Sequence, residues 1–404
     1  MPGYELWGDD ERREVMEVLE TGILMRYGFD GARRGRWKAK ELEAELCRAL
    51  GARHAHLVSS GTAALTTAMA ALGVGAGDEV IMPTFTFVAS FEGVLSVGAT
   101  PVLVDVDDTL TLSPDAVRAA ITPRTRAIMP VHMCGAMADL DALQAICREH
   151  NLLLVEDACQ AIGASYHGKA LGTIGAAGAY SFDFVKIITC GEGGAVVTND
   201  EAVWRKCDGY TDHGHDHQGA DRGADLHPFL GYNYRISELH AAVGLAQVRK
   251  LNTFLAMQRQ TKRILKDALA AVPGVTFRRL PDPAGDNAAF LSFFLPEERL
   301  ARTAADAMKQ AGLGAMYWFD NNWHYIRRWD HLRQGAFLAR LPAELARGLK
   351  AAADRSFPAS DAIMGRAIST PISLAWSEAE TRDRAAKLAA AVRSVLPGSP
   401  QYPR

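Results

Sequence analysis

The chain has no apolar run that approaches the ~20 residues needed to cross a bilayer, so we expect no membrane-spanning helix. Its first ten residues lack the basic and then apolar pattern of a secretory signal peptide, which predicts a cytoplasmic protein. Net charge is also small, because 44 Lys and Arg against 47 Asp and Glu leave −3. A balance so close to zero gives no general reason to expect binding to nucleic acid or to a membrane surface.

Cysteines are few, and they are scattered among expected helices and buried strands. They are Cys47, Cys134, Cys147, Cys159, Cys190 and Cys207. Neither a disulfide framework nor a zinc site has such wide spacing, so we expect reduced thiols and no bound metal. Internal repeats are also absent. With 48% apolar and 23% charged residues, the composition is typical of a globular protein.

Short apolar runs alternate with helical patterns over residues 38–250. We expect helices at 39–50 and 140–150, and strands at 55–58, 79–82, 101–105, 127–132, 152–157, 179–182 and 194–198. This alternation is typical of βα units around a parallel sheet. It predicts an α/β fold, with a mostly parallel mixed sheet and helices on both faces.

The alternation stops at a long helical pattern over 247–263, so we place a domain boundary near residue 250. Beyond it, a strand at 289–295 and helices at 301–311 and 378–395 indicate a smaller α+β domain. Ser377 and Glu380 have the spacing of a capping box at the start of the last helix. We therefore expect three parts: an N-terminal arm with a basic loop (1–37), a large domain (38–250) and a small C-terminal domain (251–404).

One lysine stands out in the segment 181–194. Lys186 lies among apolar and small residues just before a glycine-rich turn. Burying an ammonium group is costly, and the usual outcome is loss of its proton or a covalent partner. A desolvated lysine is the amine that forms Schiff bases with carbonyls and with pyridoxal phosphate. Taken alone, the same pattern also describes a surface lysine beside a turn.

Further candidates lie at expected strand ends, where ligands bind in open α/β sheets. Ser60, Gly61 and Thr62 separate a strand from a helix, and suit either a phosphate site or ordinary helix capping. Asp157 closes an apolar strand, either as a helix cap or as the partner of a pyridine nitrogen. Three residues later, Gln160 is placed to hydrogen-bond a ring hydroxyl.

A flat cofactor also needs an aromatic wall and further phosphate donors. We expect Phe87 to form the wall, with Phe91 as the second choice, although core packing is the favoured explanation for either side chain taken alone. Ser181 is placed to donate to the phosphate. The basic segment that contains Arg26, Arg33 and Arg34 is either a solvated loop or one that closes over an anionic substrate.

Taken together, these features have the order of a known enzyme family. The chain resembles the pyridoxal-phosphate enzymes of fold type I, in the sugar aminotransferase family (DegT/StrS type) that also serves antibiotic and lipopolysaccharide biosynthesis. The resemblance covers residues 38–250 and includes the segment 231–239. It implies pyridoxal 5′-phosphate as cofactor and a homodimer with shared active sites, in which Asn233 reaches the phosphate of the neighbouring subunit's cofactor.

The resemblance also implies a role for each residue in the motif. Lys186 carries the Schiff base and shuttles the proton, and Asp157 holds the pyridine nitrogen. Relatives with histidine in place of Lys186 resemble dehydratases, so the lysine favours amino transfer from glutamate to a keto-sugar. A pyridoxal-phosphate dehydratase and a non-catalytic regulatory protein of the same fold remain alternatives.

One branch of the family is more similar over the whole chain. Its members make 8-amino-3,8-dideoxy-manno-octulosonate (8-amino-Kdo), a lipopolysaccharide sugar, and the similar segments are 25–31, 131–135, 212–217 and 321–325. The expected acceptor is then the C8 aldehyde of 3,8-dideoxy-8-oxo-manno-octulosonate. Another keto-sugar, either nucleotide-linked or an antibiotic precursor, is the alternative.

Substrate contacts are expected from basic and histidine side chains. The carboxylates of glutamate and of a sugar acid need cationic partners, for which we select Arg26 and Arg33. We also expect contacts from His213, His215, Arg235 and His324. His213, His215 and His217 alternate in sequence, and they have three possible roles: metal binding, hydrogen bonding to substrate, or a structural loop. With no nearby cysteine or fourth ligand, we predict no metal.

Overall fold

The computed structural model describes residues 3–219 and 221–396. Its main sheet has seven strands in the order β1-β9-β8-β5-β4-β2-β3. They are β1 (His54–Val58), β2 (Glu79–Pro83), β3 (Thr100–Val104), β4 (Thr125–Ile128), β5 (Leu153–Asp157), β8 (Ala177–Ser181) and β9 (Gly194–Thr198). β9 runs antiparallel to both its neighbours, while the other strands are parallel to one another. The predicted mostly parallel mixed sheet is confirmed.

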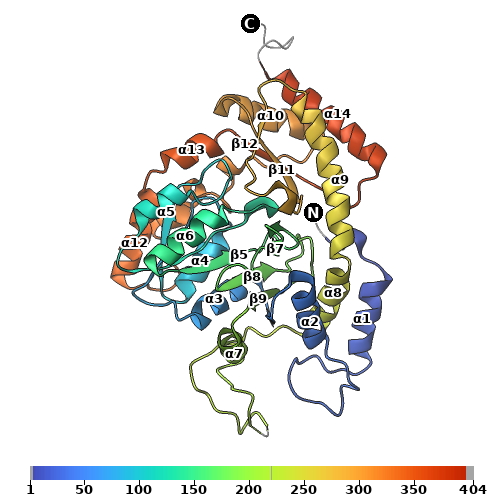
Figure 1. Ribbon diagram of the computed structural model, residues 1–404, viewed down its shortest axis with the longest axis vertical. Coiled ribbons are helices and arrows are strands. Elements are labelled where there is room, and N and C mark those ends of the chain that lie inside the picture. Colours follow the sequence, from blue (N-terminus) through green and yellow to red (C-terminus); the bar gives the residue numbers. More distant parts are fainter. Residues whose placement is uncertain (1–2, 220, 397–404) are drawn as a thin grey trace.

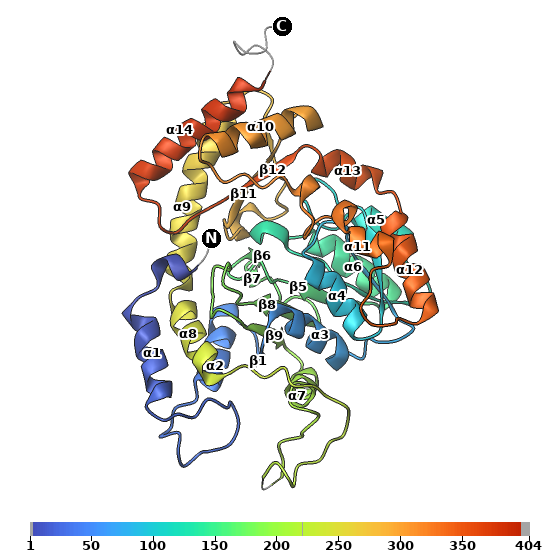
Figure 2. The same cartoon turned by 180° about the vertical axis from the view of Figure 1, so that it is seen from behind.

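Helices cover both faces of this sheet, as the two opposite views in Figures 1 and 2 show. Over its first 210 residues the chain contains α1 (Asp9–Leu19), α2 (Lys38–Leu50), α3 (Gly61–Ala71), α4 (Val88–Ser96), α5 (Pro114–Ala120), α6 (Leu140–His150) and α7 (Glu201–Tyr210). α6 shows why these segments are helical. The Asp139 side chain caps its first turn, its buried residues share one face, and Asn151 ends it in the left-handed conformation.

A second, antiparallel sheet contains β10 (Thr276–Phe277), β11 (Phe290–Phe294) and β12 (Ala367–Pro371). The long helices α9 (Leu251–Ala270) and α10 (Glu298–Gln310) pack against it, and α14 (Glu378–Ser394) packs against these two helices. Their apolar faces form a separate core cluster around Leu269, Phe293 and Val392. Ser377 and Glu380 make the predicted capping box at the start of α14. The C-terminal α+β part of the fold is therefore confirmed.

The long helix expected over 247–263 is two helices. α8 (Glu238–Arg249) and α9 meet at Lys250, whose backbone N–H bonds to Gln247 O, three residues back. The Lys250 amine is held by Glu11 and by the carbonyl of Leu6. A tertiary contact from the N-terminal segment thus lies at the junction, and local periodicity contains no signal for it.

The remaining elements are short. They are the hairpin strands β6 (Ser165–Tyr166) and β7 (Lys169–Ala170), the helices α11 (Asp330–Gln334), α12 (Ala343–Asp354) and α13 (Pro358–Met364), and the 3-10 helices η1 (Gly3–Leu6), η2 (Met133–Gly135), η3 (Pro283–Gly285), η4 (Trp318–Asp320) and η5 (Ile326–Arg328). Two longer loops, between α1 and α2 and between α7 and α8, project at the same end of the molecule in Figures 1 and 2.

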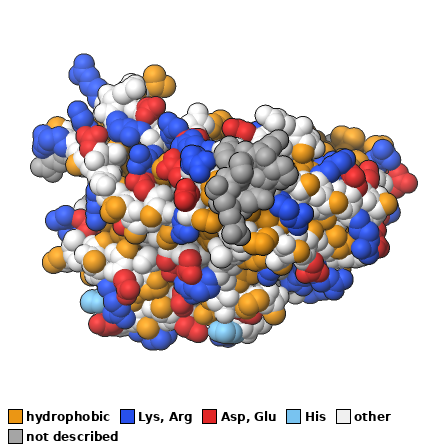
Figure 3. Space-filling view, turned by 90° about the horizontal axis from the view of Figure 1, so that it is seen from above, with side chains coloured by type: hydrophobic (Ala, Val, Ile, Leu, Met, Phe, Trp, Pro, Cys, Tyr) orange, Lys and Arg blue, Asp and Glu red, His pale blue; other side chains and the backbone are white. Residues whose placement is uncertain are grey.

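Surface charge is mixed, in keeping with the small net charge. On the face shown in Figure 3, Lys and Arg side chains are interspersed with Asp and Glu side chains. Over residues 3–219 and 221–396, none of the helices has the length and hydropathy of a membrane span. All six cysteines are free.

Candidate active site

A cavity of about 440 Å³ opens where the parallel strands β1, β2, β5 and β8 end. Because parallel strands end at one edge of a sheet, the short segments that follow them converge there. The cavity is lined by these residues selected from the sequence: Ser60, Gly61, Thr62, Phe87, Asp157, Gln160, Ser181, Lys186 and His324. The sheet thus brings together side chains that are up to 264 positions apart in the chain (from 60 to 324).

The start of α3 forms one wall. Ser60 caps the helix, because its Oγ accepts a hydrogen bond from the Ala63 N–H at 3.1 Å. A Cβ on Gly61 would lie 2.7 Å from Ser181 Cβ and 3.2 Å from Cys159 Sγ. Only glycine therefore lets the helix N-terminus approach β8 so closely. The first backbone N–H groups and the helix dipole favour an anion such as phosphate at this place.

Asp157 lies at the bottom of the site, with only 4% of its surface exposed. Its Oδ2 accepts from Ser90 Oγ at 2.6 Å, and its Oδ1 accepts from the Cys159 N–H at 3.0 Å. No Lys, Arg or His of the described residues forms an ion pair with it. A buried carboxylate normally has a cationic partner, so Asp157 is suited to a positive charge brought in by a ligand.

Ser90 is itself held by a further hydroxyl, since Thr86 Oγ1 lies 2.5 Å from Ser90 Oγ. The single Ser90 hydrogen is donated to Asp157, so the Thr86 hydroxyl, which also lies 3.2 Å from Phe87 O, is the donor in this second bond. Both hydroxyl residues are at most 1% exposed. Sequence reasoning missed this pair. The available signal was two hydroxyl residues four positions apart around the start of α4.

Lys186 lies in the turn between β8 and β9. Its backbone N–H bonds to Asp183 O at 3.0 Å, and its amine forms no hydrogen bond or ion pair with the described part of the chain. The expected apolar burial is wrong, because Lys186 is only partly buried and its neighbours Phe184 and Val185 are each 53% exposed. The amine is therefore accessible from the cavity without full desolvation.

An aromatic wall faces the lysine. The Phe87 ring lies 5.2 Å from the ring of His324 and 5.7 Å from that of Trp323. Backbone hydrogen bonds of 2.9 Å, from Thr86 N to His324 O and from Val88 N to Trp323 O, hold the two segments together. The second choice, Phe91, is 1% exposed and packs in the core.

His324 is held as a neutral ring. Burial, and then the charge of Lys186, lowers the pKa of His324 to about 3. Its Nδ1 lies 2.9 Å from Asn321 Oδ1, which can only accept, so Nδ1 carries the hydrogen. Nε2 is then an acceptor.

Gln160 also keeps its amide NH2 group available, because only its Oε1 is engaged, by the Cys134 N–H at 3.0 Å.

Arg26 and Arg33 do not line this cavity. Arg26 pairs with Glu43 at 2.8 Å and donates to Leu57 O at 2.8 Å. Arg33, 1% exposed, donates to Gly28 O at 2.6 Å and pairs with Glu238 at 3.5 Å. Within this chain both side chains hold the loop between α1 and α2 to the helices beside it.

His213, His215, Asn233 and Arg235 also lie outside the cavity lining, on the long loop between α7 and α8. Arg235 and Arg222 both pair with the buried carboxylate of Asp212. His215 lies 3.2 Å from Asp225, with its ring 4.2 Å from that of His227. Among residues 3–219 and 221–396, no group of three or more His, Cys, Asp or Glu has the arrangement of a metal site.

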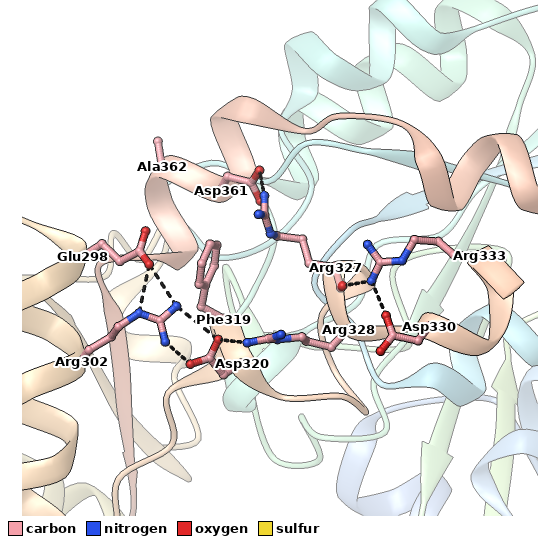
Figure 4. Close-up of a pocket in the computed structure, with 10 residues that line it drawn as sticks. All are labelled: Glu298, Arg302, Phe319, Asp320, Arg327, Arg328, Asp330, Arg333, Asp361 and Ala362. Atoms are coloured by element: carbon pink, nitrogen blue, oxygen red, sulfur yellow. Dashed lines mark hydrogen bonds and ion pairs between the residues drawn. The ribbon is translucent and has the colours of Figure 1, made fainter.

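A second cavity, of about 610 Å³, lies between η4, α11 and α13 (Figure 4). Arginines line it, and each is paired with a carboxylate: Arg302 with Glu298 and Asp320, Arg328 with Asp320, Arg327 with Asp361, and Arg333 with Asp330. Four positive and four negative side chains thus cancel. This cavity offers no unpaired charge to a ligand, whereas the cavity at Lys186 does.

The chain is similar to known proteins over almost its whole length. A family model described as the DegT/DnrJ/EryC1/StrS aminotransferase family matches residues 8–388. The structure of 3-amino-5-hydroxybenzoic acid synthase is similar at 32% identity and a TM-score of 0.79, over 96% of this chain and 97% of that one. An aminotransferase from Psychrobacter cryohalolentis has 27% identity and a TM-score of 0.81 over the same shares. DesI, solved in the presence of its TDP-sugar product, has 26% identity and a TM-score of 0.76, over 95% of this chain and 90% of that one.

Proposed function

Because the chain belongs to the DegT/DnrJ/EryC1/StrS aminotransferase family, we propose that it is a pyridoxal-phosphate-dependent transaminase that moves an amino group from glutamate to a keto-sugar. One observation carries this proposal. An unpaired lysine amine shares a cavity with a buried, cation-free carboxylate and with the N-terminus of a helix. These are the three groups that the aldehyde, the ring nitrogen and the phosphate of the cofactor require.

The residues present fit pyridoxal phosphate from end to end. The start of α3, with Thr62 and Ser181, would hold the phosphate, and Asp157 would hold the ring nitrogen. Phe87 would cover the ring, and Gln160 would bond its hydroxyl through the free part of its amide. When bound, the cofactor supplies an aldehyde for the amine and a ring that withdraws electrons from the substrate carbon.

Lys186 has two tasks in this proposal. Its Nζ would hold the cofactor through the aldehyde, and as a free amine it would move the proton at the donor's α-carbon. Partial exposure suits both tasks, because the amine must reach a substrate that enters from solvent. Asp157 would keep the ring nitrogen protonated, and the hydrogen bond from Ser90 holds that carboxylate in one orientation.

The balance of charge in the cavity supports a site completed by a second copy of the chain. Asp157, Asp183 and Glu192 line it, and Lys186 is the one Lys or Arg among its lining residues. A phosphate and the carboxylates of the substrates need more donors than one chain provides. We therefore propose a homodimer with shared active sites, in which Asn233 reaches the phosphate in the other subunit.

Exposed apolar residues near the site support the same proposal. Phe184 and Val185 are 53% exposed, and Trp323, which also lines the cavity, is 58% exposed. Side chains of this size in one area are typical of a surface that another protein covers. Arg26, Arg33, Arg235, His213 and His215 are proposed as substrate contacts in this assembly, and His324 as a contact within one chain.

For the acceptor, we propose the C8 aldehyde of 3,8-dideoxy-8-oxo-manno-octulosonate, in cytoplasmic synthesis of a lipopolysaccharide sugar. The segments 25–31, 131–135, 212–217 and 321–325 support this choice. A nucleotide-linked keto-sugar is the second candidate, because the similar protein DesI was solved with a TDP-sugar product.

The proposed domains are 1–37, 38–250 and 251–404, with the site in the large domain and His324 contributed by the small one.

The test is an assay with glutamate labelled with nitrogen-15 and a panel of acceptors, starting with the 8-oxo sugar acid. An amine product that carries the label supports amino transfer and identifies the acceptor. A deoxy-keto sugar without label would instead show a dehydratase. Failure to turn glutamate into 2-oxoglutarate, even with pyridoxal phosphate bound, would favour a regulatory protein of the same fold.

A further inference from the structure

The 3-10 helix η1 (Gly3–Leu6) is bonded to the backbone of Lys186. The Gly3 N–H donates to Lys186 O at 3.0 Å, across 183 positions of sequence (from 3 to 186). On its other side, Gly3 O accepts from Gln247 Nε2 at 3.3 Å. A Cβ at position 3 would lie 2.0 Å from Gln247 Oε1 and 2.3 Å from Ile187 O. The contact therefore requires a glycine.

A ring stack adds a second link to the same turn. The rings of Tyr4 and Phe184 lie 4.4 Å apart and are inclined by only 1°. Phe184 precedes Lys186 by two residues. Both rings are largely exposed, at 40% and 53%, so neither is held there by core packing. The stack therefore holds the turn at Phe184, two residues before the carbonyl that Gly3 holds.

The other end of η1 is fixed to distant elements. Glu5 Oε2 accepts from Ser373 Oγ at 2.7 Å, from the Leu374 N–H at 2.6 Å and from the Ala375 N–H at 3.1 Å. These three donors lie in the connection between β12 and α14. The four residues of η1 therefore connect the turn that contains Lys186, in the main sheet, to the C-terminal sheet and its helices.

We propose that η1 positions Lys186, with Gly3, Tyr4 and Glu5 as positioning residues. Holding the Lys186 carbonyl fixes its peptide plane, and with it the direction in which the side chain leaves the backbone. The Lys186 N–H is bonded only within the turn, to Asp183 O, so η1 supplies its long-range anchor. The inference rests on the proposed function only in taking Lys186 as the reactive amine.

The test uses the full-length protein and two readouts that need no cofactor. Hydrogen exchange of residues 182–190 reports how firmly the turn is held, and competitive acylation of the Lys186 amine, followed by mass spectrometry across pH, reports its reactivity. Tyr4→Ala removes the stack, and we expect exchange to become roughly 2- to 12-fold faster, as the usual strength of an aromatic pair predicts. We also expect the pH profile of Lys186 labelling to change.

Three further variants make the result specific. Glu5→Ala should have the same effects, because it releases the far end of η1. Tyr4→Phe keeps the ring and should behave like the unaltered protein. Trp7→Ala removes a similarly exposed aromatic residue, 46% exposed, from the same segment, and should change neither readout.

The inference is overturned if Tyr4→Ala and Glu5→Ala leave both exchange and labelling unchanged. Faster exchange with unchanged Lys186 labelling also overturns it, because η1 would then have a structural role alone. Uptake of pyridoxal phosphate is measured in parallel on the same samples. If the unaltered protein takes up none, the proposed function fails, while exchange and labelling still decide the role of η1.

Discussion

Ser90 Oγ donates a 2.6 Å hydrogen bond to Asp157 Oδ2, although the two residues are 67 positions apart. One lies near the start of α4, after β2, and the other ends β5. The bond holds a buried carboxylate in one orientation, and Thr86 continues the chain of hydroxyl donors behind it. The proposed hold on the cofactor ring therefore depends on Ser90, which lines the same cavity, as well as on Asp157.

Replacing Ser90 by alanine should weaken cofactor binding. Hydrogen bonds to charged groups contribute about 1.5–3 kcal/mol, so we expect the dissociation constant of pyridoxal phosphate to rise roughly 10- to 150-fold. A fluorescence or absorbance titration of the apoprotein measures it. Ser96→Ala is the matched control, because Ser96 lies on the same helix but bonds to Thr66 and Gly93. Equal affinity in the two variants would contradict the role of Ser90.

Lys186→Ala should abolish amino transfer and leave the fold intact. The amine has no partner in the described structure, so its removal should change the free energy of unfolding by less than about 1 kcal/mol. Turnover should fall by at least about 1,000-fold, since the covalent partner and the proton carrier are lost together. Steady-state rates and urea unfolding test the two parts. Lys206→Ala, at an exposed lysine on α7, should affect neither. Retained turnover would contradict the assignment.

Gly61→Ala should damage the phosphate site. The new Cβ would lie 2.7 Å from Ser181 Cβ, so the start of α3 must move away from β8. We expect at least about 10-fold weaker binding of pyridoxal phosphate, because the helix N-terminus no longer reaches the anion. Gly348→Ala, in α12, provides the control, since a Cβ there meets nothing within 4 Å. Isothermal titration with the cofactor compares the two variants. Unchanged affinity in Gly61→Ala would show that the phosphate binds elsewhere.

His324 should make stability depend on pH. Its pKa is about 3 in the folded protein, against about 6.5 when unfolded, so acid favours the unfolded chain, which binds the extra proton. The stabilisation is present above pH 6.5 and is lost as pH falls toward 3. Between pH 7 and pH 5, the titration of His324 should lower the free energy of unfolding by about 2 kcal/mol. His324→Gln should therefore lose about 2 kcal/mol less stability than the unaltered protein over that interval, measured by urea unfolding at both pH values. An equal loss in both proteins would contradict the depressed pKa.

Local signals were enough to predict much of the fold. α6 has caps and an apolar stripe within its own residues, and its predicted limits, 140–150, are those observed. β9 was also placed at its observed limits, because its short apolar run is bounded by turn residues. The parallel arrangement then follows from the alternation of strands and helices.

Contacts between distant segments were the part that the sequence could not provide. Arg26 and Arg33 lie in a basic segment with the composition of a surface loop, yet both are buried. Arg26 is paired with Glu43, and Arg33 is paired with Glu238. The break at Lys250 depends on Glu11, and the anchor of Lys186 depends on Gly3. In the cavity, Ser90 and Thr86 carry no motif of their own. Their role follows only from the fold, because the sheet places Ser90 against Asp157 and Thr86 against Ser90.

The most direct test of the account is the absorbance spectrum of the purified protein with pyridoxal phosphate, before and after addition of glutamate. Covalent capture by Lys186 predicts a band near ~410–420 nm that moves to shorter wavelength with glutamate. Lys186→Ala should lack both the band and the shift. A band that glutamate leaves unmoved would point to another donor or another reaction. No band, even with added pyridoxal phosphate, would contradict the central claim that the cavity at Lys186 is a transaminase site.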